Sequence, residues 1–504
     1  MGLRDHLAVA SGAIDTLLSL VSRYRQLLRR ASTAPGLPVP KATEPYWLAE
    51  PPFPEPRDPL PTTADVVIIG SGIAAAATAH AALELEPDLR VVVVEARQLC
   101  SGATGRNGGH VKVVPYDELA RLARRFGHQT ARRLVHFQLM HLPAFLRLGA
   151  RYSEAEVREV ETTDFFVDVK DWEAARRDVE AMRPWLPDVD ITVLDGDEAR
   201  HKTGAGFMVA GALSYKAGAL WPYRLVTAVW HGLRNRHANN LTICTLTPVE
   251  AVDDYGNSLL VRCGNGTITA RNVVHATNAF AGHLLPILRS RLTGVLGHMT
   301  AQRPGPAFPT DTHGRRSWSV IYPSSEGFDY ATQRPDRADG SPGDVLVGGG
   351  LFRSLDGGLD QIGVWDDSRL DAFPLIHLRG SLSAIFQPGG GVSAEPGAAW
   401  SGIMGFTGDT LPLVGRLPDR RRGKTAGRQW IVAGFNGEGM VWAWLCGAAV
   451  AVMLVGREKE ALPPGEGGRP GGKLADWFPA EELAVDKRRL RRAELRNLAG
   501  EVLT

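Results

Sequence analysis

The hydrophobic pattern begins, after a proline-rich stretch, with two short apolar runs. Val66–Ile69 and Val91–Val94 are continuously apolar, and the alanine-rich stretch Ile73–Leu85 lies between them. A short continuous apolar run predicts a strand buried on both faces, and a longer alanine-rich stretch predicts a helix. The pattern therefore predicts a βαβ unit.

Later segments alternate between apolar and polar residues, which is typical of half-buried strands. Examples are Asp164–Val169, Ser317–Tyr322 and Asp344–Val347. They favour an antiparallel or mixed sheet in a second domain. We therefore expect the α/β class (α+β overall), with a Rossmann-like domain beside a mixed or antiparallel-sheet domain.

One apolar run could be confused with a membrane span. Residues 439–456 carry no charge, and eighteen such residues are long enough to cross a bilayer. The run contains three glycines and has no basic flank on its N-terminal side. These features favour a buried core helix and no membrane partner.

The N-terminal part differs from the rest of the chain. Residues 3–30 predict an amphipathic helix, and Asp5 and Asp15 weaken both a signal-peptide and a mitochondrial-transit interpretation. We expect a cytoplasmic protein, with mitochondria as the alternative. Ten prolines between Pro35 and Pro61 predict an extended connector, after which folded structure begins.

The C-terminal part is polar and rich in small residues. Residues 463–472 are rich in Gly and Pro, which predicts a mobile segment. The stretch Lys487–Arg492 contains five basic residues and predicts a solvated basic helix.

Composition and charge limit the possible partners. Of 504 residues, 44% are hydrophobic and 22% charged, as in a folded globular protein. The 57 basic and 55 acidic residues leave a net charge of +2, so no overall field favours nucleic acid, and we expect a small-molecule partner. The four cysteines form no C-x-x-C pair, so neither a disulfide framework nor a metal site is expected.

A dinucleotide-binding motif lies between the first predicted strand and its helix. Gly70-Ser71-Gly72-Ile73-Ala74-Ala75 follows the pattern G-x-G-x-x-A. The first glycine permits a tight turn, the second lets the backbone approach a pyrophosphate, and the small last residue lets helix and strand pack closely. Glu95, after the second strand, offers a carboxylate to a ribose hydroxyl, which favours FAD or NAD over NADP.

A second glycine-rich run, Ser101–His110, favours FAD because a plain NAD domain does not need it. With this run, GATGRNGGH, the chain resembles the D-amino-acid-oxidase-type (DAO) superfamily of FAD-dependent oxidoreductases. It is most similar to the γ-glutamylputrescine-oxidase-like branch, especially its uncharacterised fungal members. The resemblance extends over residues 45–456 and rests on four further motifs: Gly218–Pro222, Val274–Asn278, Trp400–Asp409 and Ala433–Met440.

This resemblance implies FAD as the cofactor and a flavin domain built from several segments. The implied parts are an N-terminal helix (1–33), a connector (34–62), the flavin domain (63–115, 216–290 and 398–457), the substrate domain (116–215 and 291–397) and a tail (458–504). The family's loop equivalent to Gly434–Met440 opens a helix whose N-terminus points at the flavin ring. The residues that the resemblance and the motif place at the cofactor are Gly70, Gly72, Ile73, Ala75, Glu95, Ala96, Arg97, Gly102, Ala103, Thr104, Arg106, Asn107, Gly108, Val249, Ala276, Thr277, Asp409, Gly434, Asn436, Gly437, Glu438, Gly439 and Met440.

The residues that bond flavin covalently in other superfamily members are absent. The histidine position of dimethylglycine-dehydrogenase-like proteins falls on Arg106, and the cysteine position of monomeric sarcosine oxidases falls on Gly402. We therefore expect noncovalent FAD. Cys100 and His110 lie nearby in the sequence and leave a covalent link open.

No catalytic pair is evident, and three residues are weak candidates. The two lysines by which sarcosine oxidases hold the substrate carboxylate and activate oxygen fall on Val441 and Leu346. Lys112 is either a basic substrate ligand or an ordinary exposed lysine. Glu438 is either the counter-ion of a substrate ammonium or a hydrogen-bond acceptor for its own loop, and His110 is the third candidate.

These observations predict an FAD-dependent oxidoreductase that oxidises a C–N bond of an amine or amine derivative by hydride transfer to flavin N5. The electron acceptor, O2 or another, stays open. Two alternatives also stay open: a biosynthetic tailoring dehydrogenase acting on a larger non-amine substrate, and a flavin-stabilised assembly factor without turnover.

Overall fold

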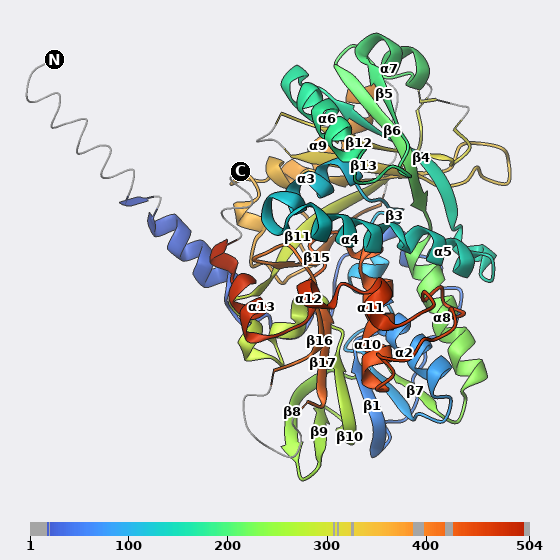
Figure 1. Ribbon diagram of the computed structural model, residues 1–504, viewed down its shortest axis with the longest axis vertical. Coiled ribbons are helices and arrows are strands. Elements are labelled where there is room, and N and C mark those ends of the chain that lie inside the picture. Colours follow the sequence, from blue (N-terminus) through green and yellow to red (C-terminus); the bar gives the residue numbers. More distant parts are fainter. Residues whose placement is uncertain are drawn as a thin grey trace, which may run out of the picture.

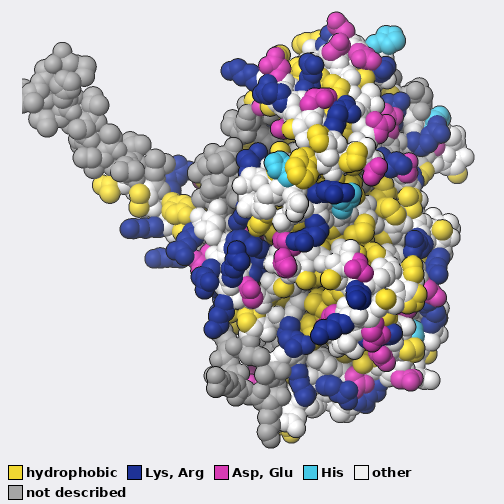
Figure 2. Space-filling model, in the orientation of Figure 1, with side chains coloured by type: hydrophobic (Ala, Val, Ile, Leu, Met, Phe, Trp, Pro, Cys, Tyr) yellow, Lys and Arg dark blue, Asp and Glu magenta, His cyan; other side chains and the backbone are white. Residues whose placement is uncertain are grey.

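The computed structural model describes residues 18–19, 21–305, 308–309, 312–323, 327–386, 398–418 and 427–497. Its strands form two large sheets, one in the lower and one in the upper half of Figure 1. Basic and acidic side chains are interspersed over the face drawn in Figure 2, in keeping with the small net charge. The described part of the N-terminal helix, residues 21–31, is helical, and most of its predicted first half lies outside the described residues.

The lower sheet contains the predicted βαβ unit. Its strand order is β16-β17-β10-β1-β2-β7, with β9 paired to β10 and β8 to β9. The strands from β17 to β7 in this order are parallel, so their carboxyl ends meet at one edge. The bounds are β1 Thr63–Ile69, β2 Val91–Val94, β7 Leu241–Cys244, β8 Val249–Tyr255, β9 Ser258–Cys263, β10 Gly266–His275, β16 Leu413–Arg416 and β17 Gln429–Ala433.

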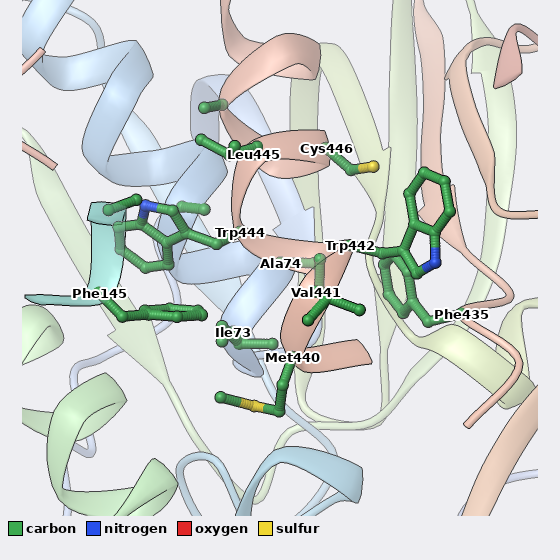
Figure 3. Close-up of a cluster of buried hydrophobic side chains, with 14 of the residues drawn as sticks. Ile73, Ala74, Phe145, Phe435, Met440, Val441, Trp442, Trp444, Leu445 and Cys446 are labelled. Carbon is green, nitrogen blue, oxygen red and sulfur yellow. The ribbon is translucent and has the colours of Figure 1, made fainter. Parts of the chain in front are cut away.

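Two apolar helices, α2 (Ile73–Leu85) and α10 (Ala443–Leu454), pack against each other beside this sheet. Gly447 allows the close approach, since a Cβ there would lie 2.4 Å from the carbonyl oxygen of Ala74. In Figure 3, Trp442 and Trp444 extend in opposite directions from the start of α10, and Trp444 lies beside Phe145. The apolar run is therefore a buried core helix, as predicted, and within the described ranges no helix has the length and apolarity to cross a membrane.

The upper sheet is mixed, which confirms the predicted second domain. Its order is β15-β11-β14-β13-β12-β4-β6-β3, with β5 paired to β6. The β4–β12 pair is parallel and the other pairs are antiparallel. The bounds are β3 His110–Val111, β4 Arg158–Phe166, β5 Ile191–Asp195, β6 Gly211–Ala219, β11 Leu292–Gln302, β12 Arg316–Ile321, β13 Phe328–Gln333, β14 Val345–Gly349 and β15 Ala399–Thr407.

The remaining helices surround the two sheets, and α3, α4 and α5 lie between the two halves of Figure 1. Helix α3 begins at Pro115, with acidic residues in its first turn and basic residues in its last, which suits the helix dipole. The bounds are α3 Pro115–Phe126, α4 His128–Leu139, α5 His141–Gly149, α6 Val169–Met182, α7 Gly196–Thr203, α8 Pro222–Arg236, α9 Ala372–Phe386, α11 Leu474–Trp477, α12 Ala480–Leu483 and α13 Lys487–Arg492.

The sheets divide the chain differently from the sequence-based boundaries in three places. Strands β3 and β15, and the end of β6, belong to the upper sheet, although the sequence assigns their residues to the flavin domain. Strand β3 directly follows the glycine-rich run at the start of α2, β6 leads into α8, and β15 leads into β16 of the lower sheet. The motifs of the resemblance mark segments near the cofactor, whereas sheet membership is decided by backbone pairing between distant segments, which no local motif shows.

The proline-rich connector is extended, but it is part of the folded body. The Trp47 side chain is buried. The backbone carbonyl oxygen of Trp47 accepts a 3.0 Å hydrogen bond from the indole nitrogen of Trp221. Asp58 accepts from the backbone of Ile243 at 2.9 Å. The prediction that folded structure begins only after the connector is therefore wrong, because proline-rich chain can pack through side chains without forming regular elements.

Two predictions about the C-terminal part are also wrong. The segment 463–472 is packed rather than mobile: Leu462 and Gly472 exchange two backbone hydrogen bonds, and Gly467 accepts from the indole of Trp444 at 2.7 Å. Helix α13 is not simply solvated, since Arg489 is one of the most deeply buried side chains of the described chain. Figure 1 shows α11, α12 and α13 running along the body of the molecule.

Candidate functional site

The glycine motif forms a tight turn between β1 and α2. Gly70 has a φ of +103°, and a Cβ there would lie 2.7 Å from the carbonyl oxygen of Ala276. Gly72 precedes α2 without a side-chain cap of its own. Thr104, from the second glycine-rich run, accepts from the backbone of Ile73 at 3.0 Å, so the two runs meet at the start of this helix.

Glu95 is hydrogen-bonded to this turn at the carboxyl end of β2. Its Oε2 accepts from the backbone and the hydroxyl of Ser71, at 3.0 and 2.7 Å, and its Oε1 accepts from the backbone of Arg97 at 2.9 Å. A carboxylate can accept about four hydrogen bonds. Glu95 therefore stabilises the turn and keeps capacity for a ribose hydroxyl.

Thr277 provides a test of whether these residues fit FAD. It follows Ala276, whose carbonyl oxygen faces Gly70, and its hydroxyl is buried without a partner within the described part of the chain. Its methyl group would lie 3.6 Å from a Cβ on Gly70. An orphaned hydroxyl beside a glycine turn and a helix N-terminus suits an anionic phosphate, so the residues fit the cofactor.

The second glycine-rich run joins the turn to the upper sheet. Asn107 donates to Thr104 at 2.9 Å and accepts from the backbone of Gly109 at 2.8 Å. Gly108 accepts from the Thr332 hydroxyl at 2.6 Å, and a Cβ on Gly108 would lie 2.4 Å from the ring of Tyr330. The predicted residues Gly102, Ala103 and Thr104 thus lie in a loop that both halves hold in place.

Arg106 and Arg97 extend into a buried network that joins the connector to both halves. The guanidinium of Arg106 donates to the carbonyls of Ser101 and Ser401, at 2.9 and 2.8 Å, and to Thr43. Asp367 accepts from Arg97 at 3.0 Å and lies 3.5 Å from Arg106. Both guanidinium groups are bonded within this network, so Arg97 and Arg106 would contact FAD through their backbone only.

The C-terminal glycine loop is held by two asparagines. Asn278 accepts from the backbone of Gly434 at 2.9 Å, and Asn436 accepts from the backbone of Thr407 at 2.8 Å. Met440 is buried in the turn Gly439–Val441 that precedes α10, whereas Gly437 and Glu438 are exposed. The loop therefore presents the Glu438 carboxyl group next to the helix that the resemblance places at the flavin ring.

Two predicted cofactor residues lie within the protein interior. Val249 is a core residue of β8. Asp409 is buried and forms ion pairs with Arg489, at 2.5 Å, and Arg492, at 2.8 Å. The Asp409 carboxylate therefore stabilises the contact between the β15–β16 turn and the C-terminal tail.

Lys112 already has partners in the described structure. Its ammonium forms an ion pair with Asp164 and a 2.6 Å hydrogen bond with Ser319. Asp164 also accepts from Tyr116 and Tyr215, at 2.9 and 2.6 Å. A substrate carboxylate would have to displace this buried pair, which argues against Lys112 as its ligand.

His110 lies beside the ring of Tyr330, with its Nε2 buried and without a partner among the described residues. Burial lowers the pKa of His110 well below its ordinary value, and the Lys112 charge acts in the same direction. His110 is therefore neutral at physiological pH.

Glu438 lies at the end of a polar cluster that the sequence does not reveal. Its Oε2 is 3.3 Å from the indole nitrogen of Trp442 and 3.4 Å from Nε2 of Gln138. The same Gln138 nitrogen lies 3.3 Å from Oε1 of Glu118, whose Oε2 pairs with Arg121 at 2.5 Å. Desolvation of the Glu438 carboxyl group by the surrounding protein raises its pKa well above the ordinary value. The Glu118 charge raises the pKa further, and the Arg121 charge opposes this by a smaller amount.

Glu118, Arg121 and Gln138 were missed because their importance depends on α3 and α4 reaching the C-terminal loop. A buried carboxyl group at Glu118, on the apolar face of an amphipathic helix, is the one signal the sequence offers. Within the described residues, no group of three or more His, Cys, Asp or Glu side chains could hold a metal ion.

Comparison with known proteins relates this geometry to a family. Residues 65–453 match the family model described as "DAO: FAD dependent oxidoreductase". The chain is 24% identical over 411 residues to "Probable oxidoreductase OrdL" of Rhizobium meliloti (strain 1021), covering 79% of this chain and 84% of that protein. It is also 24% identical over 224 residues to "Gamma-glutamylputrescine oxidoreductase" of Escherichia coli (strain K12), covering 44% of this chain and 50% of that protein.

A solved structure shares the fold. The chain superposes on the glycine oxidase of Geobacillus kaustophilus with a TM-score of 0.59 and 19% sequence identity, covering 79% of this chain and 96% of that one. At this identity the likeness concerns the fold alone.

Proposed function

The chain belongs to the DAO family of FAD-dependent oxidoreductases, and from that premise we propose that it oxidises a C–N bond of an amine or amine derivative. FAD, when bound, would accept one hydride, that is two electrons with one proton, from the substrate. The Gly70 turn, Glu95, Thr277 and the start of α2 would hold its dinucleotide part. The Gly434–Met440 loop would lie against its ring.

The observation that carries this proposal is the charge of the groups around the C-terminal loop. Glu438 is exposed on the loop, while the nearby cations Lys112 and Arg121 are paired with Asp164 and Glu118. Val441 is buried where sarcosine oxidases carry the lysine for a substrate carboxylate. A free amino acid would bring an anion to a place with no unpaired cation among these groups, whereas an ammonium would find a carboxyl group.

An anaerobic reduction assay tests the proposal. The purified holoprotein is mixed without oxygen with a panel of monoamines, diamines and acylated polyamines, and with sarcosine, proline and D-alanine. We expect amines to bleach the flavin absorbance faster than the amino acids. Rapid bleaching by an amino acid, and none by any amine, would contradict the proposal. Bleaching by neither would favour a non-amine substrate or a protein without turnover.

A further inference from the structure

The polar cluster beside Glu438 contains two carboxyl groups and one cation. Arg121 donates to Glu118 through one nitrogen and to the Thr410 hydroxyl, at 2.6 Å, through the other. Among the described residues Arg121 forms its ion pair with Glu118, and its charge also lowers the pKa of Glu438. Glu118 is therefore the more strongly compensated carboxylate, and the charge of Glu438 depends more on a proton or an incoming cation.

Gln138 joins the two carboxyl groups. Its side-chain nitrogen lies within hydrogen-bond distance of both, at 3.3 Å from Glu118 and 3.4 Å from Glu438. Its Oε1 is buried without a partner in the described structure. An amide in this position can donate to an ionised Glu438, or turn and accept from a protonated one, so it can satisfy either protonation state.

The other groups that approach the loop do not supply a free charge. From β3, His110 is kept neutral by burial. From α5, His141 is kept neutral as well, since burial lowers its pKa to about 4. Lys112 is held by Asp164. The balance at Glu438 is therefore set by Glu118 and Arg121 of α3, with Gln138 of α4 and Trp442 as neutral hydrogen-bond donors.

We propose that Glu438 is the group that accepts the proton of a substrate ammonium, and that Glu118 and Gln138 are positioning residues that set when it can do so. This inference rests on the proposed function. One N–H bond of the ammonium breaks, its electron pair stays on nitrogen as the lone pair, and the proton forms an O–H bond with the Glu438 carboxylate. The products are a neutral amine and a neutral carboxylic acid, and no electrons leave the substrate in this step.

The structure explains why such a step is useful and how it is limited. A C–N bond is oxidised from the neutral amine. The nitrogen lone pair must be free to form the C=N bond as the hydride leaves the neighbouring carbon. The like charge of Glu118 raises the affinity of Glu438 for a proton, which makes it a better acceptor. Below the pKa of Glu438 the group already carries a proton, so both ammonium binding and proton acceptance should weaken on the acid side.

The test measures a pH dependence in the holoprotein. Binding of tetramethylammonium, a cation without an N–H bond, is followed by the perturbation of the flavin absorbance between pH 5 and 9. The pH dependence of kcat/KM for the best amine of the anaerobic panel is measured in parallel. In the wild-type protein both should fall on the acid side with the same midpoint.

Three variants make the inference specific. Glu438→Gln should lower tetramethylammonium affinity about tenfold at high pH and remove its acid-side fall. Glu118→Gln removes the like charge, so the pKa of Glu438 falls and the midpoint of both profiles should move about one unit to lower pH. Glu173→Gln, at an exposed position on α6, is the control and should leave both profiles unchanged.

An unchanged midpoint in Glu118→Gln, in a protein that keeps its bound flavin and oxidises amines, would overturn the inference. So would an acid-side fall that persists in Glu438→Gln. Failure of the proposed function would show separately, as the absence of flavin reduction by every amine.

Discussion

At Gly70, the absence of a Cβ lets the turn after β1 pass close to the backbone of Ala276. A methyl group there would lie 2.7 Å from the Ala276 carbonyl oxygen, and the φ of +103° is unfavourable for any other residue. We expect Gly70→Ala to weaken FAD binding at least about tenfold, because the turn beside the phosphates must shift. Titration of apoprotein with FAD, followed by fluorescence, measures this.

Gly256→Ala is the matched control for that substitution. Gly256 also has a positive φ, +59°, but a Cβ there would meet nothing within 4 Å. It lies at a turn between β8 and β9, away from the glycine motif. Gly256→Ala should therefore keep the wild-type FAD affinity, and equal affinities in the two variants would contradict a role of the Gly70 turn in FAD binding.

His141 couples stability to pH. Its Nδ1 lies 3.1 Å from two α4 carbonyl oxygens, and its Nε2 accepts from the backbone of Leu445 at 3.3 Å. Burial lowers its pKa to about 4. Between pH 6.5 and about 4 the unfolded chain binds a proton that the folded protein does not, so stability is present above this window and is lost as pH falls through it.

We expect His141→Gln to flatten the fall of the unfolding temperature between pH 6.5 and 4. The full effect of a shift of this size is on the order of 3 kcal/mol. Thermal unfolding followed by circular dichroism at each pH measures it. His201→Gln, at an exposed helical position, should keep the wild-type slope, and an equal slope in His141→Gln would rule out this role.

Among the elements, helix α13 packs against the β15–β16 turn, and this turn is hydrogen-bonded to the loop that carries Glu438. Arg489 donates to the carbonyl oxygen of Leu411 at 2.6 Å and pairs with Asp409. The backbone of Gly408 donates to Ala493 at 2.9 Å, and neighbouring Thr407 donates to Asn436 of the loop at 2.8 Å. The C-terminal tail therefore stabilises the loop from behind.

We expect Arg489→Gln to destabilise the protein by about 3 kcal/mol, because it leaves part of a buried carboxylate uncompensated. If the C-terminal tail stabilises the Gly434–Met440 loop, the loss of unfolding free energy should be larger for the FAD-bound form than for the apo form. Denaturant unfolding of both forms measures the difference. Arg488→Gln, at the exposed neighbouring position, is the control, and equal losses in the two variants would contradict a buried role.

For the whole molecule, we propose that FAD lies between the two sheets. The Gly70 turn belongs to the lower half, and the Gly108 loop bonds to Thr332 of the upper sheet. FAD bound between such segments stabilises the folded state by mass action. We expect the holoprotein to unfold at a clearly higher temperature than the apoprotein, and the difference to grow with added FAD.

The same arrangement predicts noncovalent FAD. Arg106 occupies the position of a linking histidine, and its guanidinium is engaged by Ser101, Ser401 and Thr43. Gly402 offers no thiol, and Cys100 is buried with its pKa raised well above the ordinary value by burial. Acid precipitation should leave intact FAD in the supernatant. Flavin that remains with the pellet would point to a covalent link.

The amino-acid sequence by itself determined the local parts of this protein. The βαβ unit, the glycine turn with Glu95, and the apolar core helix α10 follow from short patterns whose physics is local: apolar runs, missing Cβ atoms and helix-compatible residues. The resemblance extended these parts to FAD and to a second, mixed sheet. The family match and the two observed sheets confirm those expectations.

Only the tertiary structure decided which polar groups are partners. Glu118 and Glu438 are 320 positions apart, and Asp409 and Arg489 are 80 apart, yet each pair belongs to one cluster. The sequence predicts that the proline-rich connector precedes the folded structure and that the basic helix is solvated, but the burial of both segments depends on the surfaces that other segments offer. A side chain's environment is set by packing between distant elements, and a local pattern carries no information about that packing.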